Sequence, residues 1–153
     1  MLDSVIVNPP PGQPHFYTMI LLHDNNDNGI DFSEALFRTW ATNRNGHDPH
    51  TNIRGLLPGF RFVFPTAPLS VVGNPWQTTW FQQLIDDSGR PRATQPSLED
   101  NIDDLLLLIR AESRIVPRGQ IFLGGFGQGC AMAIATFFAD GEGDFGGLIG
   151  LNG

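Results

Sequence analysis

Residues 121–138 read IFLGGFGQGCAMAIATFF, and this stretch decides the fold. It opens with an apolar run of strand length, and four of residues 124–129 are glycine. Small and apolar residues then continue to Ala139, which is typical of a buried helix. Because glycine tolerates backbone conformations that other residues avoid, it suits a very tight connection. The stretch therefore predicts a strand over residues 120–123, a sharp turn centred on Gly127, and a helix over residues 130–139.

The rest of the chain repeats this alternation of strand-like and helix-like segments. Apolar runs of strand length lie at residues 5–7, 17–22, 60–64 and 145–151, and amphipathic helical patterns lie at about residues 31–41 and from residue 98 onward. Ser97 is placed to cap the second helix. Residues 72–96, rich in Gly, Pro, Gln and Trp, are predicted to form a long surface excursion with a functional role. Alternating strands and helices predict a three-layer α/β domain with a mostly parallel sheet.

Composition limits the partners of the chain. With 153 residues, 41% hydrophobic and 16% charged, it has the size and composition of one globular domain. A net charge of -7, with no lysine among nine basic residues, predicts binding neither to nucleic acid nor to anionic membrane. No stretch is long and apolar enough to insert into a membrane, and the start lacks the features of a signal peptide. Together with a single cysteine, Cys130, these features predict a cytoplasmic protein.

The segment DNNDNGIDFSE, residues 24–34, resembles a calcium-binding loop at first sight. Its closing glutamate, Glu34, falls at position 11 where that motif needs position 12, and the loop follows a strand-like segment where the motif needs a helix. We therefore interpret it as a strand-to-helix loop. His47, Asp48 and His50 have metal-ligand spacing but lack a third firm ligand in their polar loop. We predict neither a metal nor another cofactor.

A family resemblance adds to this pattern. Gly125-Phe-Gly-Gln-Gly129 takes the position of the G-x-S-x-G nucleophile elbow of α/β-hydrolases, with Gly127 in place of the serine. The stretch resembles the GGFSQGG segment of the acyl-protein thioesterase and carboxylesterase family. ILLHD at 20–24, FVFPTAPL at 62–69 and TTWFQ at 78–82 agree with further landmarks of that family in the same order. The resemblance implies a single truncated domain, residues 1–153, that forms the N-terminal part of an α/β-hydrolase fold and lacks its last strands.

The resemblance also implies where a site would lie. In this family the loop after the first strand and the residue after the nucleophile each supply one N–H of the oxyanion hole. Asn25 or Asn26, together with Gln128, would supply them here. Asp24 stands where the family has glycine, and its charge would oppose the oxyanion. Gly127 cannot attack a substrate, and the family's Asp and His lie beyond the strand where this chain stops, so the roles of all three triad residues are vacant.

Three interpretations of function follow. The first is a degenerate carboxylesterase- or thioesterase-like protein that binds a small acyl or carbonyl-containing molecule without hydrolysing it, in a pocket lined by Trp76, Trp80 and Phe81. The second is a non-hydrolytic cyclase or isomerase that uses Asp24 and His23 for proton transfer and the residual oxyanion hole for a carbonyl. The third is a fragment of a longer hydrolase. His23 alone is better explained as a structural histidine.

Two structural expectations complete the interpretation. Gly125 and Gly129 should leave room for a serine at position 127, and Cys130 should pack as a small apolar group. A sheet that lacks its last strands exposes an edge and the apolar faces that those strands would cover. We therefore predict a homo-oligomer, most simply a two-fold dimer that buries this surface.

Overall fold

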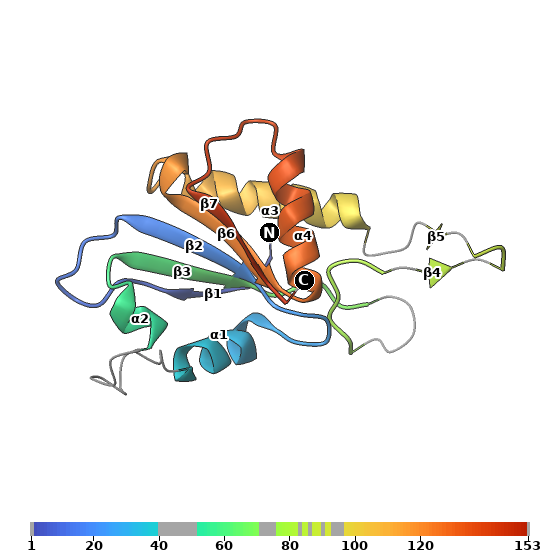
Figure 1. The fold of residues 1–153 in the computed structure, drawn as a ribbon, viewed down its shortest axis with the longest axis horizontal. Coiled ribbons are helices and arrows are strands. Elements are labelled where there is room, and N and C mark those ends of the chain that lie inside the picture. Colours follow the sequence, from blue (N-terminus) through green and yellow to red (C-terminus); the bar gives the residue numbers. More distant parts are fainter. Residues whose placement is uncertain are drawn as a thin grey trace.

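The computed structural model describes residues 2–39, 52–70, 76–82, 84–85, 87–89, 91–92 and 97–152, which form a main sheet with helices on both faces and a separate two-stranded ribbon (Figure 1). Its elements, in chain order, are β1 (Ser4–Val7), β2 (Tyr17–Leu22), α1 (Gly29–Arg38), α2 (Ile53–Leu56), β3 (Phe60–Pro65), β4 (Leu84–Ile85), β5 (Pro91–Arg92), α3 (Leu98–Glu112), the 3-10 turn η1 (Arg118–Gln120), β6 (Ile121–Phe126), α4 (Gln128–Ala139) and β7 (Gly147–Leu151).

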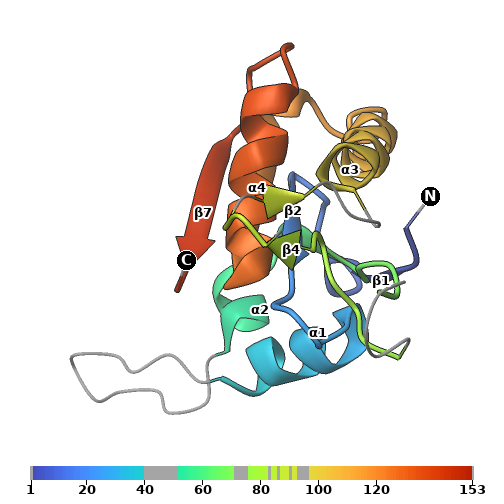
Figure 2. The same cartoon turned by 90° about the vertical axis from the view of Figure 1, so that its right-hand side faces the viewer.

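The sheet confirms the predicted fold class. Its five strands run in the order β1-β3-β2-β6-β7, and only β1, at one edge, is antiparallel to its neighbour. Helices α3 and α4 cover one face of the sheet, and α1 and α2 lie on the other (Figure 2). The protein is therefore a three-layer α/β structure with a mostly parallel sheet, as the alternation of segments predicts.

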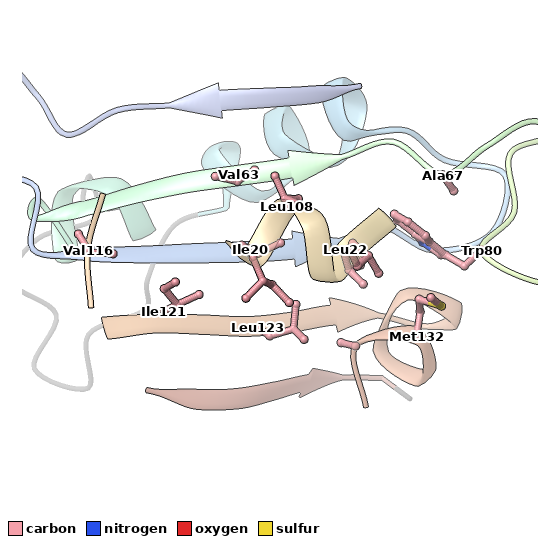
Figure 3. Close-up of a cluster of buried hydrophobic side chains, with 13 residues drawn as sticks. Ile20, Leu22, Val63, Ala67, Trp80, Leu108, Val116, Ile121, Leu123 and Met132 are labelled. Atoms are coloured by element: carbon pink, nitrogen blue, oxygen red, sulfur yellow. The ribbon is translucent and has the colours of Figure 1, made fainter. Parts of the chain in front are cut away.

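Alternating side chains of the central strands fill a core on each face of the sheet. Ile20, Leu22, Val63 and Leu123 point toward α3 and α4 and belong to one buried cluster (Figure 3). Met19, Leu21, Phe62 and Phe64 belong to a second cluster, which contains Phe32 of α1. This two-residue period is the property of a strand whose two faces are both covered. It fixes the register of β2, which lies between β3 and β6.

The ends of the helices differ from the sequence prediction by two or three residues. Helix α1 begins at Gly29 because the Asn28 side chain accepts a hydrogen bond from the Asp31 N–H, and it ends at Arg38. Helix α3 begins as predicted, and Ser97 accepts from the Asp100 N–H. Strand β6 extends through Gly124 and Gly125, and α4 starts directly after Gly127, so the turn between them is tighter than predicted.

This arrangement places two loops side by side. Strands β2 and β6 are parallel neighbours, with Leu21 opposite Gly124 and Leu22 opposite Gly125. Because both strands end at the same edge of the sheet, the loop that begins at His23 meets the turn at Gly127. That edge is where open α/β sheets bind ligands. Among the described helices, none has both the length and the apolar character needed to cross a membrane.

Candidate functional site

The turn at Gly127 has the geometry of a strained elbow. Gly127 has φ 54° and ψ -120°, a strained conformation that residues with a side chain rarely adopt. The residues two positions away on either side, Gly125 and Gly129, are glycines because the chain approaches itself closely there. A Cβ on Gly125 would lie 2.3 Å from the Gly129 carbonyl oxygen, and one on Gly129 would lie 2.4 Å from the Leu22 carbonyl oxygen. The G-x-G-x-G pattern therefore allows α4 to begin directly against the end of β2.

The carboxylate of Asp24 fills the space in front of this turn. A Cβ added to Gly127 would lie 2.2 Å from Asp24 Cγ, 2.2 Å from Oδ1 and 2.4 Å from Oδ2. The carboxyl group thus occupies the place of the side chain that residue 127 lacks. The expectation that Gly125 and Gly129 leave room for a serine at position 127 is wrong, because Asp24 reaches across from the opposite loop and takes that room.

One oxygen of this carboxylate accepts two main-chain hydrogen bonds. Asp24 Oδ1 lies 2.8 Å from the Asn25 nitrogen and 2.7 Å from the Gln128 nitrogen. The Asn26 N–H instead donates to the Thr78 carbonyl oxygen at 3.0 Å. Asn25 and Gln128 therefore point their N–H groups at one position, as an oxyanion hole does, and a negative oxygen of the protein already lies there.

His23 is held between two main-chain groups. Its Nε2 accepts a hydrogen bond from the Ala67 N–H at 2.9 Å, so its proton is on Nδ1, which donates to the Asp24 carbonyl oxygen at 2.6 Å. Burial lowers the pKa of His23 below its ordinary value of 6.5, although the bond to the Asp24 carbonyl and the charges of Asp27 and Asp24 act in the opposite direction. The ring is thus neutral at pH 7 with both nitrogens engaged, which leaves neither free for proton transfer.

The three aromatic residues of the predicted pocket lie in different environments. Trp80 is fully buried, and its indole N–H donates to the His23 carbonyl oxygen at 2.8 Å. Trp76 is 83% exposed. Phe81 is half-buried and lines a cavity. Phe81 thus lines a cavity, whereas the excursion that carries the three residues enters the core at Trp80, where the sequence predicts a surface segment.

The cavity beside Phe81 has a volume of about 220 Å³ and a polar wall. Asn25, Gln77, Thr79, Phe81 and Gln128 line it, together with Ser70 and Gln82. Gln128 therefore contributes its N–H to the Asp24 contact and its side chain to this wall. The place of Gln128 directly after the elbow centre predicts the role of its N–H group. No sequence pattern indicates the role of its side chain.

The Gln128 side chain fastens the excursion to the start of α4. Its Oε1 accepts from Thr79 Oγ1 at 3.0 Å and from the Trp80 N–H at 2.8 Å, and its Nε2 donates to the Phe81 carbonyl oxygen at 2.8 Å. Three bonds from one amide hold residues 79–81 in a fixed position. The polar cavity is therefore built on a rigid frame that also carries the Gln128 N–H group bonded to Asp24.

A second cavity lies on the other side of Gly127. It has a volume of about 350 Å³ and a mostly apolar wall formed by Gly127, Cys130, Ala131, Ile134 and Gly150. Cys130 is buried there, and a Cβ on Gly150 would lie 3.0 Å from its sulfur atom. Cys130 thus lies on α4 and packs against β7.

The polar residues of the 24–34 loop hold its own backbone. Asp27 Oδ1 accepts from the Asn28 N–H at 2.8 Å, and Asn28 Oδ1 accepts from the Asp31 N–H at 2.9 Å. Within the described residues, no group of three His, Cys, Asp or Glu side chains converges on a point that could hold a metal ion. His47, Asp48 and His50 lie outside the described residues.

Comparison with known proteins agrees with this geometry. Residues 3–153 match the model of the Phospholipase/Carboxylesterase family. The acyl-protein thioesterase 1 homolog 1 of Dictyostelium discoideum is 28% identical over 143 residues, which cover 91% of this chain and 58% of that protein. The acyl-protein thioesterase 1 of Saccharomyces cerevisiae is 28% identical over 149 residues, covering 92% of this chain and 59% of that protein.

Solved structures show the same fold. The acyl-protein thioesterase 2 of Zea mays superposes with a TM-score of 0.60 at 22% identity, over 99% of this chain and 63% of that one. Esterase PE8 superposes with a TM-score of 0.62 at 23% identity, over 89% of this chain and 57% of that one. The chain thus spans less than two thirds of the length of each of these proteins.

The engagement of His23 predicts a pH dependence of stability. Because folding lowers the pKa of His23, the unfolded chain binds a proton below pH 6.5 that the folded chain does not bind. The stability that the neutral His23 ring contributes is fully present above pH 6.5. As the pH falls below 6.5, the free energy of unfolding decreases by up to about 1.4 kcal/mol per pH unit. Urea unfolding of the His15→Gln variant, which removes the other histidine with a lowered pKa, should show this loss.

The matched variant carries His23→Gln in addition. It should be less stable at pH 7.5, because the bonds to Ala67 and Asp24 are lost or altered, but its stability should fall less between pH 6.5 and pH 5.5. Equal losses in the two variants over that range would show that His23 is not held neutral.

Proposed function

Because the chain belongs to the phospholipase/carboxylesterase family, we propose that it is a non-hydrolytic member whose oxyanion hole is closed by its own Asp24. We further propose that it binds a small carbonyl- or acyl-containing molecule beside that hole. One observation carries the proposal: Asp24 Oδ1 accepts hydrogen bonds from the Asn25 and Gln128 N–H groups at 2.8 and 2.7 Å. These are the donors that an ester or thioester would need as its tetrahedral intermediate forms.

Two requirements of serine-dependent hydrolysis are unmet at the same place. Position 127, where the family's nucleophile would stand, has no hydroxyl group to attack a carbonyl carbon. Loss of one oxyanion-hole donor typically slows such reactions about 10²- to 10³-fold, and here both donors are engaged by Asp24. These features favour the binding interpretation over that of a fragment of an active hydrolase.

The acid–base alternative has weaker support. A cyclase or isomerase that used the pair Asp24 and His23 would need a histidine nitrogen free to exchange a proton with substrate. Both nitrogens of His23 are bonded to main-chain groups, so proton transfer would depend on Asp24 alone. The same carboxylate would also have to leave the oxyanion hole before a substrate carbonyl could enter. A cytoplasmic location and the absence of a cofactor stay predictions.

The proposal predicts that the protein does not react as a serine hydrolase. Purified protein should hydrolyse p-nitrophenyl acetate at the rate of buffer alone and should take up no fluorophosphonate probe. Gly127→Ser should behave in the same way, because the introduced hydroxyl meets the Asp24 carboxylate and has no base to activate it.

Both forms should be measured in a Cys130→Ala background, so that acylation of the thiol is not mistaken for serine chemistry, with an active serine esterase as the positive control. Intact-mass spectrometry gives the stoichiometry of labelling. One probe per chain on the introduced serine would show that a base is present in the site and would overturn the proposal.

We also propose a two-fold dimer, supported by exposed apolar side chains beside one edge of the sheet. Strand β7 lies at the end of the strand order, and Leu148 and Leu151 on it are exposed. On the adjacent helix α4, Phe138 is 78% exposed and Ile134 is also exposed. Exposed apolar side chains beside an open sheet edge are a surface that a partner can cover.

Sedimentation equilibrium tests the dimer. The wild-type chain should sediment as a dimer, and Phe138→Glu should shift it toward the monomer because it places a charge in the proposed interface. Ile30→Glu changes an exposed isoleucine on α1, on the opposite face of the sheet, and should leave the dimer intact. A wild-type protein that sediments as a monomer would contradict the proposal.

A further inference from the structure

We infer that the polar cavity beside Gln128 binds an uncharged, hydroxyl-rich molecule about the size of a monosaccharide. This inference goes beyond the proposed function, which concerns an acyl- or carbonyl-containing ligand, and assigns a separate ligand to the polar cavity. It concerns the cavity of about 220 Å³ between the 24–27 loop, the 77–82 excursion and the start of α4.

The side chains of the wall define the chemistry of the ligand. Apart from Phe81, every lining residue ends in an amide or a hydroxyl group, and none of them carries a charge. Amides and hydroxyls both donate and accept hydrogen bonds, so together they match a ligand whose groups also do both. Sugar hydroxyl groups have this property, whereas an alkyl chain would leave these groups without partners.

Two amides of the wall are available to a ligand. Within the described part of the chain, no hydrogen bond is formed by the side chain of Asn25 or by that of Gln77. Asn25 is exposed and Gln77 is half-buried, so each can turn toward a bound molecule without breaking an internal bond. Each amide offers two donors and one acceptor oxygen.

The opposite part of the wall is fixed in advance. The Gln128 amide bonds to Thr79 Oγ1, to the Trp80 N–H and to the Phe81 carbonyl, so these groups lose little freedom when a ligand binds. Its Nε2 has a second N–H beyond the one that Phe81 accepts. A rigid half and two adjustable amides suit a small ligand whose hydroxyl groups must be placed individually.

The charge next to the wall excludes anions. Asp24 Oδ1 lies within 2.8 Å of the Asn25 and Gln128 backbone nitrogens, and both of these residues line the cavity. A carboxylate or phosphate ligand would therefore lie near a fixed negative charge in a chain whose net charge is -7. The volume is also below the roughly 300–1,000 Å³ of sites for drug-sized molecules. A neutral sugar or polyol carries no charge and is small enough for this volume.

Titration followed by ¹H–¹⁵N correlation spectra tests this inference with three probes: glucose, its charged analogue glucuronate, and hexanoate as a short acyl chain. Glucose should shift the side-chain amide signals of Asn25 and Gln77. Glucuronate should bind at least about tenfold more weakly, as expected for one unfavourable charge contact. Gln77→Ala should weaken glucose binding about tenfold through lost hydrogen bonds. Gln13→Ala, in the connection between β1 and β2, serves as the matched control and should leave glucose binding unchanged.

The outcomes separate this inference from the proposed function. Glucuronate binding as tightly as glucose, or no shift with glucose, would overturn the inference. Hexanoate that shifts the signals of Ala131 and Ile134 in the apolar cavity, without glucose binding, would overturn it and still support an acyl-binding protein. The labelling experiment with fluorophosphonate decides independently whether the protein is non-hydrolytic.

Discussion

The carboxylate of Asp24, held between the N–H groups of Asn25 and Gln128, is the interaction on which the site depends. It is possible only because residue 127 is glycine, since a Cβ there would lie 2.2 Å from the carboxyl carbon. It in turn occupies the two donors that would otherwise face an open cavity. The carboxylate also lies at the N-terminus of α4, where the helix dipole stabilises negative charge. Glycine at the elbow and aspartate on the opposite loop are therefore complementary parts of one arrangement.

The same contact connects the two loops to the rest of the fold. Parallel pairing of β2 with β6 brings the 23–27 loop to the elbow, and His23 then bridges Asp24 to Ala67 after β3. Gln128 extends the connection to the excursion through Thr79, Trp80 and Phe81. Four segments that are distant in sequence thus meet at the carboxyl end of the sheet. In a hydrolase such a network would position a reacting carbonyl, whereas here its centre is occupied by a side chain of the protein.

Much of the fold could be predicted because its signals are local. The runs at residues 17–22 and 60–64, the Ser97 cap and the glycine turn each indicate the local structure of their own segment. The resemblance of residues 121–138 and of three further motifs to one family predicts the family, which the comparisons confirm. The starts of α1 and α4 differ from the prediction because they depend on a cap at Asn28 and on the conformation of Gly127. The Asn28 cap and the Gly127 conformation are properties of single residues, and the periodic spacing of apolar residues does not indicate them.

The site was less predictable because its decisive contacts join distant residues. Sequence reasoning placed Asp24 beside the oxyanion hole and anticipated a conflict of charge. In the structure the carboxylate accepts hydrogen bonds from the Asn25 and Gln128 N–H groups, and this depends on the space at position 127. Trp80 was predicted to line a pocket, but its indole N–H reaches the His23 carbonyl and its ring lies in the core. The Gln128 side chain finds its partners in the excursion, 47 to 49 residues away in sequence.

A double-mutant cycle between Asp24 and Gly127 tests the central claim most directly. Free energies of unfolding in urea would be measured for wild type, Asp24→Gly, Gly127→Ala and the double variant. In the wild-type background the added methyl group meets the Asp24 carboxylate, whereas in the Asp24→Gly background only the cost of the positive φ remains. Gly127→Ala should be less destabilising without Asp24, with a coupling of about 1–3 kcal/mol. Effects that add to within about 0.5 kcal/mol would show that the Asp24 carboxylate does not occupy the space at position 127.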